Sequence, residues 1–364
     1  MTETGKTLIY LVSCGLNGTV PDGGIAARSD LRELYALAKR NSLAALVSVA
    51  LKRAGISDGN FISAYNNAIR KIALLDNERK EICSVFEKEG IEYMPLKGSE
   101  LKDYYPLPGM REMSDVDILI DPSKRAEVKD IMLGRGYTAE TYGRGNHDAY
   151  LKKPVLNFEM HTALFPERVE FSSYYSDVLK NAEKEEGFAR RFRDEDFYLY
   201  ITAHEYKHFS NNGTGLRSLA DRYVFIREKG DGLDWNYIES ESAKLGISEY
   251  EKEGRELALK LFSASEYPVF TPEEEEKADS YLSSGTYGSV EQGVEKELTH
   301  KSKLSYMLGI IFLPRKQMAQ SVPFTAKCVL LYPAGVVWRI IRVFFRRRKQ
   351  LKATLGAVKD YDKQ

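Results

Sequence analysis

Two aspartates placed two residues apart in an apolar segment constrain this sequence more than any other feature. Asp115 and Asp117 lie within residues 114–121, where they alternate with valine and isoleucine. In a β-strand successive side chains point to opposite faces, so both carboxylates share one face and the β-branched side chains form the other. Neighbouring carboxylates repel each other unless a cation joins them, and Mg²⁺ is bound by carboxylates together with substrate phosphates. The pattern therefore predicts a strand with a cation-binding face.

A glycine–serine turn comes shortly before this strand. Residues 91–96 form an apolar run that predicts another strand, and Gly98 and Ser99 follow it. Because glycine has no Cβ, the backbone N–H groups of such a turn can approach a phosphate closely. The turn is therefore a candidate phosphate-binding element.

A third carboxylate lies about forty residues after the aspartate pair. In residues 156–161 the alternation puts Asn157, Glu159 and His161 on one face of a predicted strand. A glycine turn, an aspartate pair and a later acid are together typical of a two-metal centre for phosphoryl or nucleotidyl transfer. The plainer interpretation is an acidic strand edge that faces solvent.

Composition limits the class of protein. The 364 residues suffice for about two domains. Lysine plus arginine and aspartate plus glutamate both number 53, so the zero net charge argues against a general nucleic-acid binder. Cys14, Cys83 and Cys328 lie far apart, which favours a reducing, cytoplasmic location and excludes a disulfide framework or a cysteine-based zinc site.

The patterning predicts an α+β fold in four parts. A helical segment spans residues 1–79, a small mixed sheet with flanking helices spans 80–165, a helical domain spans 166–300, and apolar and basic helices span 301–364. The short apolar run at residues 8–12 predicts the start of a buried helix, because it is too short for a secretory signal. No run reaches the roughly 18 apolar residues that a spanning helix needs.

The C-terminal part leaves two interpretations open. Its apolar segments are broken by prolines and end in a basic cluster at residues 346–349. Such helices either pack back on the body or lie on an anionic membrane surface, and the first interpretation is favoured.

The motif His204-Glu205-Tyr206-Lys207-His208 is the strongest competitor for the catalytic role. On a helix, His-Glu-x-x-His puts both imidazoles on one face, with the glutamate as the general base of a zinc protease. No third ligand stands out downstream, where Asp221 and Glu228 are the nearby choices. A structural or substrate-lining role for the two histidines is therefore favoured.

Beyond these motifs, the sequence resembles the nucleotidyltransferase fold superfamily, similar in layout to DNA polymerase β and the antibiotic nucleotidyltransferases. More closely, it resembles a bacterial family of largely uncharacterised nucleotidyltransferases. The sheet-region matches are Leu96-Lys97-Gly98, Tyr105-Pro106, Arg111, Asp115-Val116-Asp117-Ile118-Leu119-Ile120, Gly136-Tyr137 and Glu159-Met160-His161. The matches in the helical region are His204, His208, Gly215, Leu216, Arg217, Leu219 and Asp221.

The resemblance implies a role for each acid. Asp115 and Asp117 would hold two Mg²⁺ ions that bridge the triphosphate of an NTP, for example ATP. Glu159 would join the second ion and help to activate the acceptor oxygen. An acceptor hydroxyl would then attack the α-phosphorus in line. No long nucleic acid is expected as the acceptor, and its identity stays open.

The resemblance also implies roles for neighbouring polar residues. Gly98 and Ser99 would cradle the phosphates, and Lys97 or Arg111 would neutralise the leaving pyrophosphate unless they are surface cations. The candidate acceptor-side residues are His161, His204, His208, Arg217 and Asp221. For Asp221, an ion pair with Arg217 is favoured over a role as a base.

The sequence thus predicts a Mg²⁺-dependent nucleotidyltransferase that uses an NTP. Two alternatives remain. One is a zinc-dependent hydrolase built on His204 and His208, and the other is a non-catalytic nucleotide-binding protein.

Overall fold

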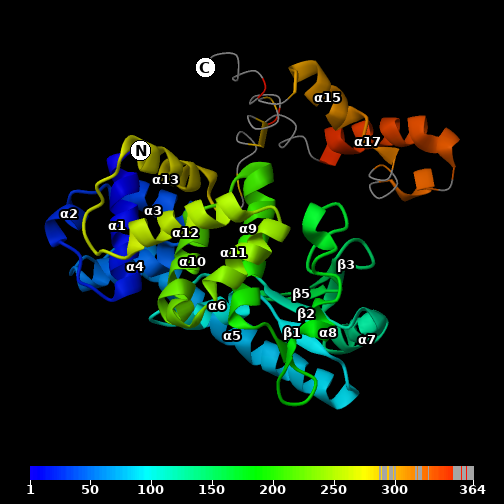
Figure 1. Ribbon diagram of the computed structural model, residues 1–364, viewed down its shortest axis with the longest axis horizontal. Coiled ribbons are helices and arrows are strands. Elements are labelled where there is room, and N and C mark those ends of the chain that lie inside the picture. The colour runs from blue at the N-terminus through cyan, green and yellow to red at the C-terminus, as the bar shows by residue number, and fades with distance from the viewer. Residues whose placement is uncertain are drawn as a thin grey trace. The chain divides into compact units, whose positions relative to one another are not determined.

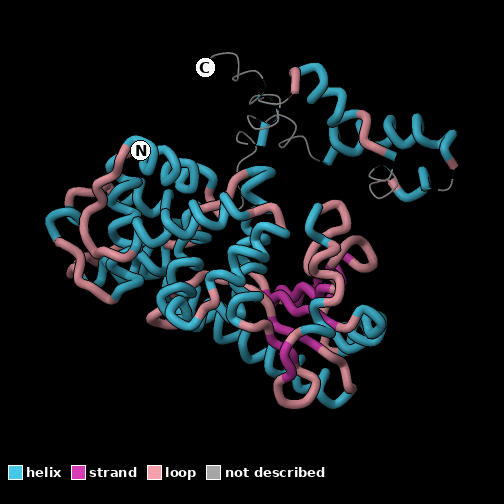
Figure 2. The backbone as a smooth tube through the Cα atoms, in the orientation of Figure 1, coloured by secondary structure: helices cyan, strands magenta, loops and turns pink. Residues whose placement is uncertain are grey.

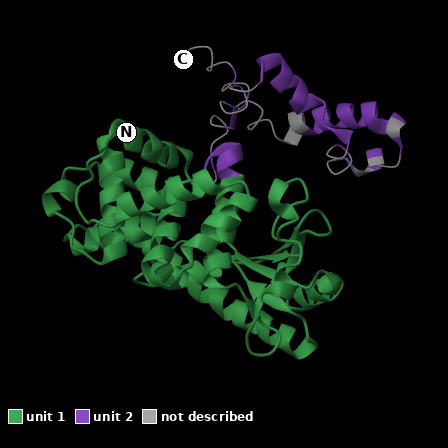
Figure 3. Cartoon of the chain, in the orientation of Figure 1, with its two compact units in different colours: residues 1–207, 215–286 green, residues 208–214, 287–364 purple. Residues whose placement is uncertain are grey.

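The chain folds into a mixed α+β structure, shown as a computed structural model in Figures 1 and 2, which confirms the predicted class. The structure describes residues 1–286, 288, 293–294, 298, 301–315, 318, 322–326, 328–346, 354 and 358. Residues 1–207 and 215–286 form one compact unit, and residues 208–214 and 287–364 form a second (Figure 3). The predicted four-part division stays a prediction.

A mixed five-stranded sheet lies in the first unit. Its strands are β1 (Tyr93–Pro95), β2 (Val116–Ile120), β3 (Thr138–Thr141), β4 (His147–Lys152) and β5 (Leu156–His161). The strand order is β1-β2-β5-β4-β3. Strands β2 and β5 run parallel, whereas the other neighbouring pairs are antiparallel. The predicted strands are therefore present, and the two that carry the acids lie side by side.

Two helices cover the apolar face of β2. They are α5 (Gly59–Glu89), which begins at an Asp58 cap and ends at Gly90 in the left-handed conformation, and α7 (Arg125–Gly134). Ile118 and Ile120 of β2 are buried in one hydrophobic cluster with side chains of both helices. This packing turns the aspartate side of β2 toward the opposite face of the sheet.

Helices from both ends of the first unit share another hydrophobic cluster. From the N-terminal side these are α1 (Glu3–Asn17), α2 (Gly23–Ala27), α3 (Leu31–Arg40) and α4 (Ala44–Arg53). From later in the chain come α10 (Leu216–Lys229), α12 (Ser248–Phe262) and α13 (Pro272–Ser284). The predicted buried helix at residues 8–12 is confirmed, because these side chains lie inside α1. Chain segments before and after the sheet thus form a single core.

A third hydrophobic cluster joins the sheet to α9 (Asp194–Asn212), in which Leu119 of β2 packs with aromatic residues of the helix. The remaining elements near it are α6 (Gly98–Leu101), α8 (Val178–Asn181), α11 (Trp235–Lys244) and the two-stranded sheet of β6 (Glu183–Lys184) and β7 (Arg190–Arg191). The 3₁₀ helices of the chain are η1 (Lys102–Tyr104), η2 (Pro122–Lys124), η3 (Glu170–Ser172), η4 (Gly230–Gly232), η5 (Pro323–Ala326) and η6 (Val329–Leu331).

The second unit contains α15 (Lys303–Ile311) and α17 (Tyr332–Arg346). Side chains of α17 are exposed at Val337, Trp338, Ile340 and Ile341. Of the predicted basic cluster, residues 347–349 lie outside the described residues. Within the described part of the chain, no helix combines the length and apolar character needed to cross a membrane.

Candidate functional site

Three carboxylates gather where β2 and β5 run side by side. Asp117 on β2 is the register partner of Glu159 on β5, and Asp115 lies one residue before β2 begins. Burial raises the pKa of Asp115, and the charges of Asp117 and Glu159 raise it further. The acids predicted from two separate strands therefore lie within strong electrostatic reach of one another.

A lysine and a histidine contact Asp117. The Lys97 ammonium donates to Asp117 Oδ1 at 2.8 Å, and His161 Nε2 lies 2.7 Å from the same oxygen. Burial alone would raise the pKa of Asp117, but the charge of Lys97 and the bond with His161 hold it well below its usual range. The Lys97 side chain is 18% exposed. The surface-cation interpretation of Lys97 is therefore wrong, and the residue belongs to the carboxylate site.

The backbone of Lys97 is unusual as well. Its φ of 47° and ψ of −112° put a non-glycine residue at positive φ, between β1 and α6. Such conformations cost about 1–3 kcal/mol and persist only where the surrounding structure imposes them. The turn thus holds the ammonium beside Asp117 despite local strain.

The glycine–serine turn is packed against the protein. A Cβ on Gly98 would lie 2.4 Å from Arg111 Nη1 and 2.6 Å from Met113 Sδ, so a larger residue here would force these side chains to shift. The Ser99 N–H donates to the Leu96 carbonyl at 3.2 Å. Within the described residues, the buried Ser99 hydroxyl has no hydrogen-bond partner. The phosphate cradle stays a prediction, and the Ser99 hydroxyl is a buried polar group of this turn.

Arg111 is committed to another partner. Its Nε and Nη2 donate to Asp221 Oδ1 and Oδ2 at 2.7 and 2.9 Å, and the Tyr105 hydroxyl donates to Oδ1 at 2.8 Å. Burial opposes the charge of Arg111, but Asp221 outweighs it and raises the pKa of Arg111. Arg217 instead donates to the Glu112 carbonyl at 3.1 Å. The predicted Arg217–Asp221 pair is therefore wrong, because both carboxylate oxygens of Asp221 are bound by Arg111.

His147 joins the site, although sequence reasoning missed it. It is the register partner of His161 on the neighbouring strand, and its Nε2 lies 3.5 Å from Glu159 Oε2. His161 Nε2 lies 3.6 Å from the same oxygen. His147 is the first residue of β4 and its partners lie on the neighbouring strand β5, so no pattern within its own strand indicated its role.

These contacts set the protonation of the carboxylate–imidazole group. The close contact with His161 is the main cause that lowers the pKa of Glu159. Burial would lower the pKa of His161, but its hydrogen bond to Asp117 and its contact with Glu159 raise it. Burial lowers the pKa of His147, which the Glu159 charge only partly offsets. These contacts therefore favour the ionised forms of Asp117 and Glu159 at neutral pH.

Lys207 is a second residue that sequence reasoning missed. It lies inside the His-Glu-x-x-His motif, and its Nζ is 6.0 Å from the centre of the Phe165 ring. Burial lowers the pKa of Lys207 to about 8, the nearby Lys97 charge lowers it as well, and Asp117 and Glu159 act in the opposite direction. The His-Glu-x-x-His pattern draws attention to its histidines, whereas Lys207 is the residue within electrostatic reach of Asp117 and Glu159.

Glu205 and His204 of that motif pack against neighbouring side chains, whereas His208 is exposed. Glu205 forms a buried ion pair with Arg222, and burial raises the pKa of Glu205 to about 7. The His204 ring packs 6.4 Å from the Phe165 ring. Within the described residues, His204 and His208 do not belong to any group of three potential metal ligands. The zinc-hydrolase alternative therefore gains no support.

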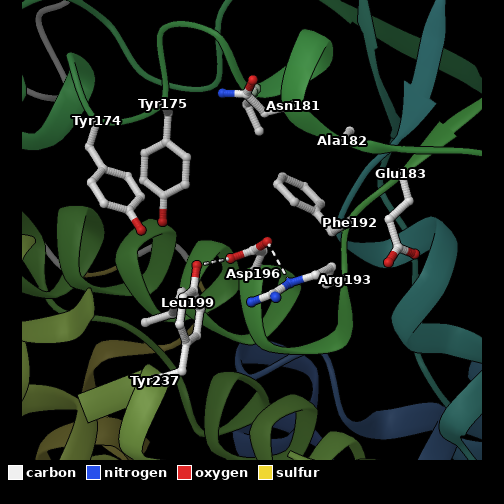
Figure 4. Close-up of a pocket in the computed structure, with 11 residues that line it drawn as sticks. Tyr174, Tyr175, Asn181, Ala182, Glu183, Phe192, Arg193, Asp196, Leu199 and Tyr237 are labelled. Carbon is white, nitrogen blue, oxygen red and sulfur yellow. Dashed lines mark hydrogen bonds and ion pairs between the residues drawn. The ribbon is translucent and has the colours of Figure 1, made fainter. Parts of the chain in front are cut away.

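A pocket of about 210 Å³ lies between the loop before β6, α9 and α11 (Figure 4). It is lined by Tyr174, Tyr175, Val178, Asn181, Ala182, Glu183, Phe192, Arg193, Asp196, Leu199 and Tyr237. As Figure 4 shows, Asp196 accepts hydrogen bonds from Tyr237 at 2.8 Å and from Arg193 at 3.3 Å. None of the three site carboxylates lines this pocket, so it is distinct from the carboxylate site.

Comparison with known proteins assigns the chain to a class. Residues 27–263 match the model of a family described as uncharacterised nucleotidyltransferase. The comparisons found no matching curated protein and no matching solved structure. The matched region covers more than half of the chain and contains the whole carboxylate site. The chain therefore belongs to this nucleotidyltransferase family, and the protein is an enzyme of that class.

Proposed function

We propose that this enzyme transfers a nucleoside monophosphate from an NTP to a hydroxyl acceptor at the site of Asp115, Asp117 and Glu159. The observation that carries the proposal is the register of β2 and β5, which sets Asp117 directly beside Glu159. Lys97 adds a cation within hydrogen-bond distance of Asp117. A site for a polyanionic substrate requires such a positive charge. The family match supports the reaction class.

The donor set fits divalent cations. Mutual repulsion among the three acids raises the pKa of Asp115 beyond the effect of burial, and a bound cation would relieve that repulsion. Carboxylate and triphosphate oxygens suit Mg²⁺, which we expect at Asp115 and Asp117, with Glu159 serving a second ion. When bound, the ions would neutralise the developing charge on the phosphates and stabilise the attacking and leaving oxygens.

The protein's own cations would bind the triphosphate. Lys97 Nζ already contacts a carboxylate oxygen that the proposal gives to a cation, so we expect it to move to a phosphate oxygen when nucleotide binds. Lys207 would add a second positive charge, and the Ser99 hydroxyl would donate to a phosphate oxygen. Arg111 would act indirectly, because its bidentate bond to Asp221 fixes the side chain that packs on Gly98.

Glu159 would receive the proton of the acceptor hydroxyl. Its side chain is 24% exposed, so a substrate can reach it, and its lowered pKa keeps it ionised at neutral pH. The acceptor oxygen would form a bond to the α-phosphorus as the bond to the pyrophosphate oxygen breaks. Positioning and electrostatic stabilisation would supply most of the rate.

Replacing both aspartates tests the proposal. The Asp115→Asn, Asp117→Asn double variant should lose on the order of a hundredfold or more of the pyrophosphate release seen with wild type across a panel of NTPs and acceptors. Asp130→Asn on the exposed side of α7 is the matched control and should keep wild-type turnover. Circular dichroism checks that the variants fold. Full turnover in the double variant contradicts the proposal, as does NTP binding by wild type without pyrophosphate release for any acceptor.

We also propose that α17 contacts an anionic membrane surface. Exposed apolar side chains at Val337, Trp338, Ile340 and Ile341 support this, since they lie on a helix that also carries arginines. Amphipathic helices of this composition bind at the boundary between headgroups and acyl chains.

A further inference from the structure

The β4–β5 pair adds two imidazoles to the carboxylate site. His147 and His161 are register partners, and Glu159 lies two residues before His161 on the same strand. Register partners on neighbouring strands point to the same side of a sheet, as do residues i and i+2 of one strand. The three side chains therefore share one face because of the backbone pairing.

The distances match what one cation requires. Both imidazole Nε2 atoms lie near Glu159 Oε2, at 3.5 Å for His147 and 3.6 Å for His161. One ligand atom from each residue lies within 4.8 Å of the others. Nitrogen and oxygen ligands of a transition metal lie about 2.0–2.2 Å from the ion, so two such ligands are at most about 4.4 Å apart. Side-chain adjustments of a few tenths of an ångström would close the group around an ion.

The surroundings hold this group in place. His161 is 3% exposed and its ring centre lies 5.0 Å from that of His147. Asp148, next to His147, is buried and accepts two bonds from Arg125 at 2.6 Å and one from the Gly143 N–H at 2.8 Å. These bonds fix the start of β4, and with it the backbone of His147.

We propose that His147, Glu159 and His161 bind a divalent transition-metal ion in preference to Mg²⁺. Imidazole nitrogen suits ions such as Zn²⁺, Fe²⁺ and Co²⁺, whereas Mg²⁺ is bound through oxygen. This metal site rests on the proposed function, because Glu159 is a ligand both in the proposed reaction and in the group with His147 and His161. The second ion of the reaction would then be a transition metal, while the aspartate side keeps Mg²⁺.

Metal binding also changes the role of His161. Its Nε2 is the atom that now contacts Asp117 Oδ1 at 2.7 Å. A nitrogen lone pair that ligates a metal cannot also hold the proton of that hydrogen bond, so His161 exchanges Asp117 for the ion. Asp117 would thereby gain an oxygen for the cation on the aspartate side.

Titration calorimetry of the full chain tests this without any turnover. Protein freed of metal with EDTA is titrated with Zn²⁺, Mn²⁺ and Mg²⁺ in the absence of nucleotide. We expect about one tightly bound transition-metal ion per chain, and weaker binding of Mg²⁺. His147→Ala and His147→Gln should each weaken Zn²⁺ binding roughly tenfold or more, because a ligand is lost. His147 is half-exposed, and melting curves in EDTA check that both variants fold.

Two controls separate the possible outcomes. His204→Ala should bind Zn²⁺ as wild type does, and loss of Zn²⁺ in this variant would assign the ion to the other histidine motif and overturn the inference. The Asp115→Asn, Asp117→Asn variant should keep the ion while it loses turnover. Equal affinity for Mg²⁺ and Zn²⁺, or wild-type Zn²⁺ affinity in both His147 variants, also overturns the inference. A wild type that binds Zn²⁺ but releases no pyrophosphate would contradict only the proposed function.

Discussion

At the scale of single residues, Lys97 combines an uncommon backbone conformation with a buried ion pair. Its backbone sits at positive φ, and its ammonium lies 2.8 Å from a carboxylate that is almost fully buried. A buried ion pair adds little net stability compared with an apolar pair of similar size. Removing one partner is nevertheless costly, because it leaves a buried charge uncompensated. The strain and the pairing together point to a residue kept in place for substrate binding.

Replacing Lys97 by methionine should therefore destabilise the protein. We expect the free energy of unfolding to fall by about 3 kcal/mol, because Asp117 loses its ammonium partner in a buried position. Adding Asp117→Asn should recover part of this loss, and urea denaturation of both single variants and the double variant measures the coupling. Additive effects of the two substitutions would show that the pair is not coupled.

The lowered pKa of Lys207 predicts that the activity depends on pH. Burial and the Lys97 charge lower its pKa to about 8, so its positive charge is complete well below that pH and is lost as the pH rises through it. If Lys207 contacts phosphates, kcat/KM for the NTP should fall on the alkaline side with a midpoint near this pKa. Lys207→Arg should keep its activity to higher pH, since arginine stays charged. An unchanged alkaline limb in this variant would rule out Lys207 as its source.

At the scale of elements, the Arg111 side chain links the glycine turn, the loop before β2 and helix α10. Arg111 packs against Gly98 and makes its bidentate bond to Asp221 on α10. The turn that carries Lys97 is thereby positioned by the helical region as well as by the sheet. A change in this packing should reach the site.

Adding a methyl group at Gly98 tests this linkage. Gly98→Ala should cost about 1–3 kcal/mol of stability, because the new Cβ forces Arg111 or Met113 to move in a packed interior. Gly134→Ala is the control, since a Cβ there meets nothing within 4 Å and its φ is ordinary. Chemical denaturation compares the two, and equal stability of both variants would contradict the linkage.

Local patterns predicted the elements well. The alternation in residues 156–161 matches β5, and the apolar run at residues 8–12 lies in a buried helix as predicted. Contacts between residues far apart in the chain could not be predicted from such local patterns. The Arg111–Asp221 bond joins residues that lie 110 positions apart in the chain, whereas the predicted partner Arg217 is a near neighbour of Asp221 in the sequence. His147 carried no pattern of its own, because its partners come from the neighbouring strand.

At the scale of the whole molecule, the chain forms two compact units with different contents. The first unit contains the sheet, the carboxylate site and the shared helical core, whereas the second contains α15 and α17. Trp338 of α17 is 53% exposed, and several apolar neighbours on the same helix are exposed too. Exposed apolar groups on an arginine-bearing helix indicate a contact surface.

Vesicle sedimentation tests the proposed membrane contact. The full chain should sediment with anionic phosphatidylglycerol vesicles more than with neutral phosphatidylcholine vesicles, and added salt should weaken the binding. Trp338→Glu should reduce it, because a charge then replaces an apolar contact. Val269→Glu is the control, since Val269 is 83% exposed but lies outside α17. Equal loss in both variants, or no sedimentation of wild type, would contradict the contact.

The position of the label after turnover tests the central claim most directly. Wild type is incubated with an NTP labelled in the α-phosphate, and separately with one labelled in the γ-phosphate, together with an acceptor that supports pyrophosphate release. The proposed reaction predicts that the α label joins the acceptor and the γ label leaves in pyrophosphate, and that both results vanish in the Asp115→Asn, Asp117→Asn variant but not in Asp130→Asn. Transfer of the γ label to the acceptor, or undiminished α transfer in the double variant, would contradict the account.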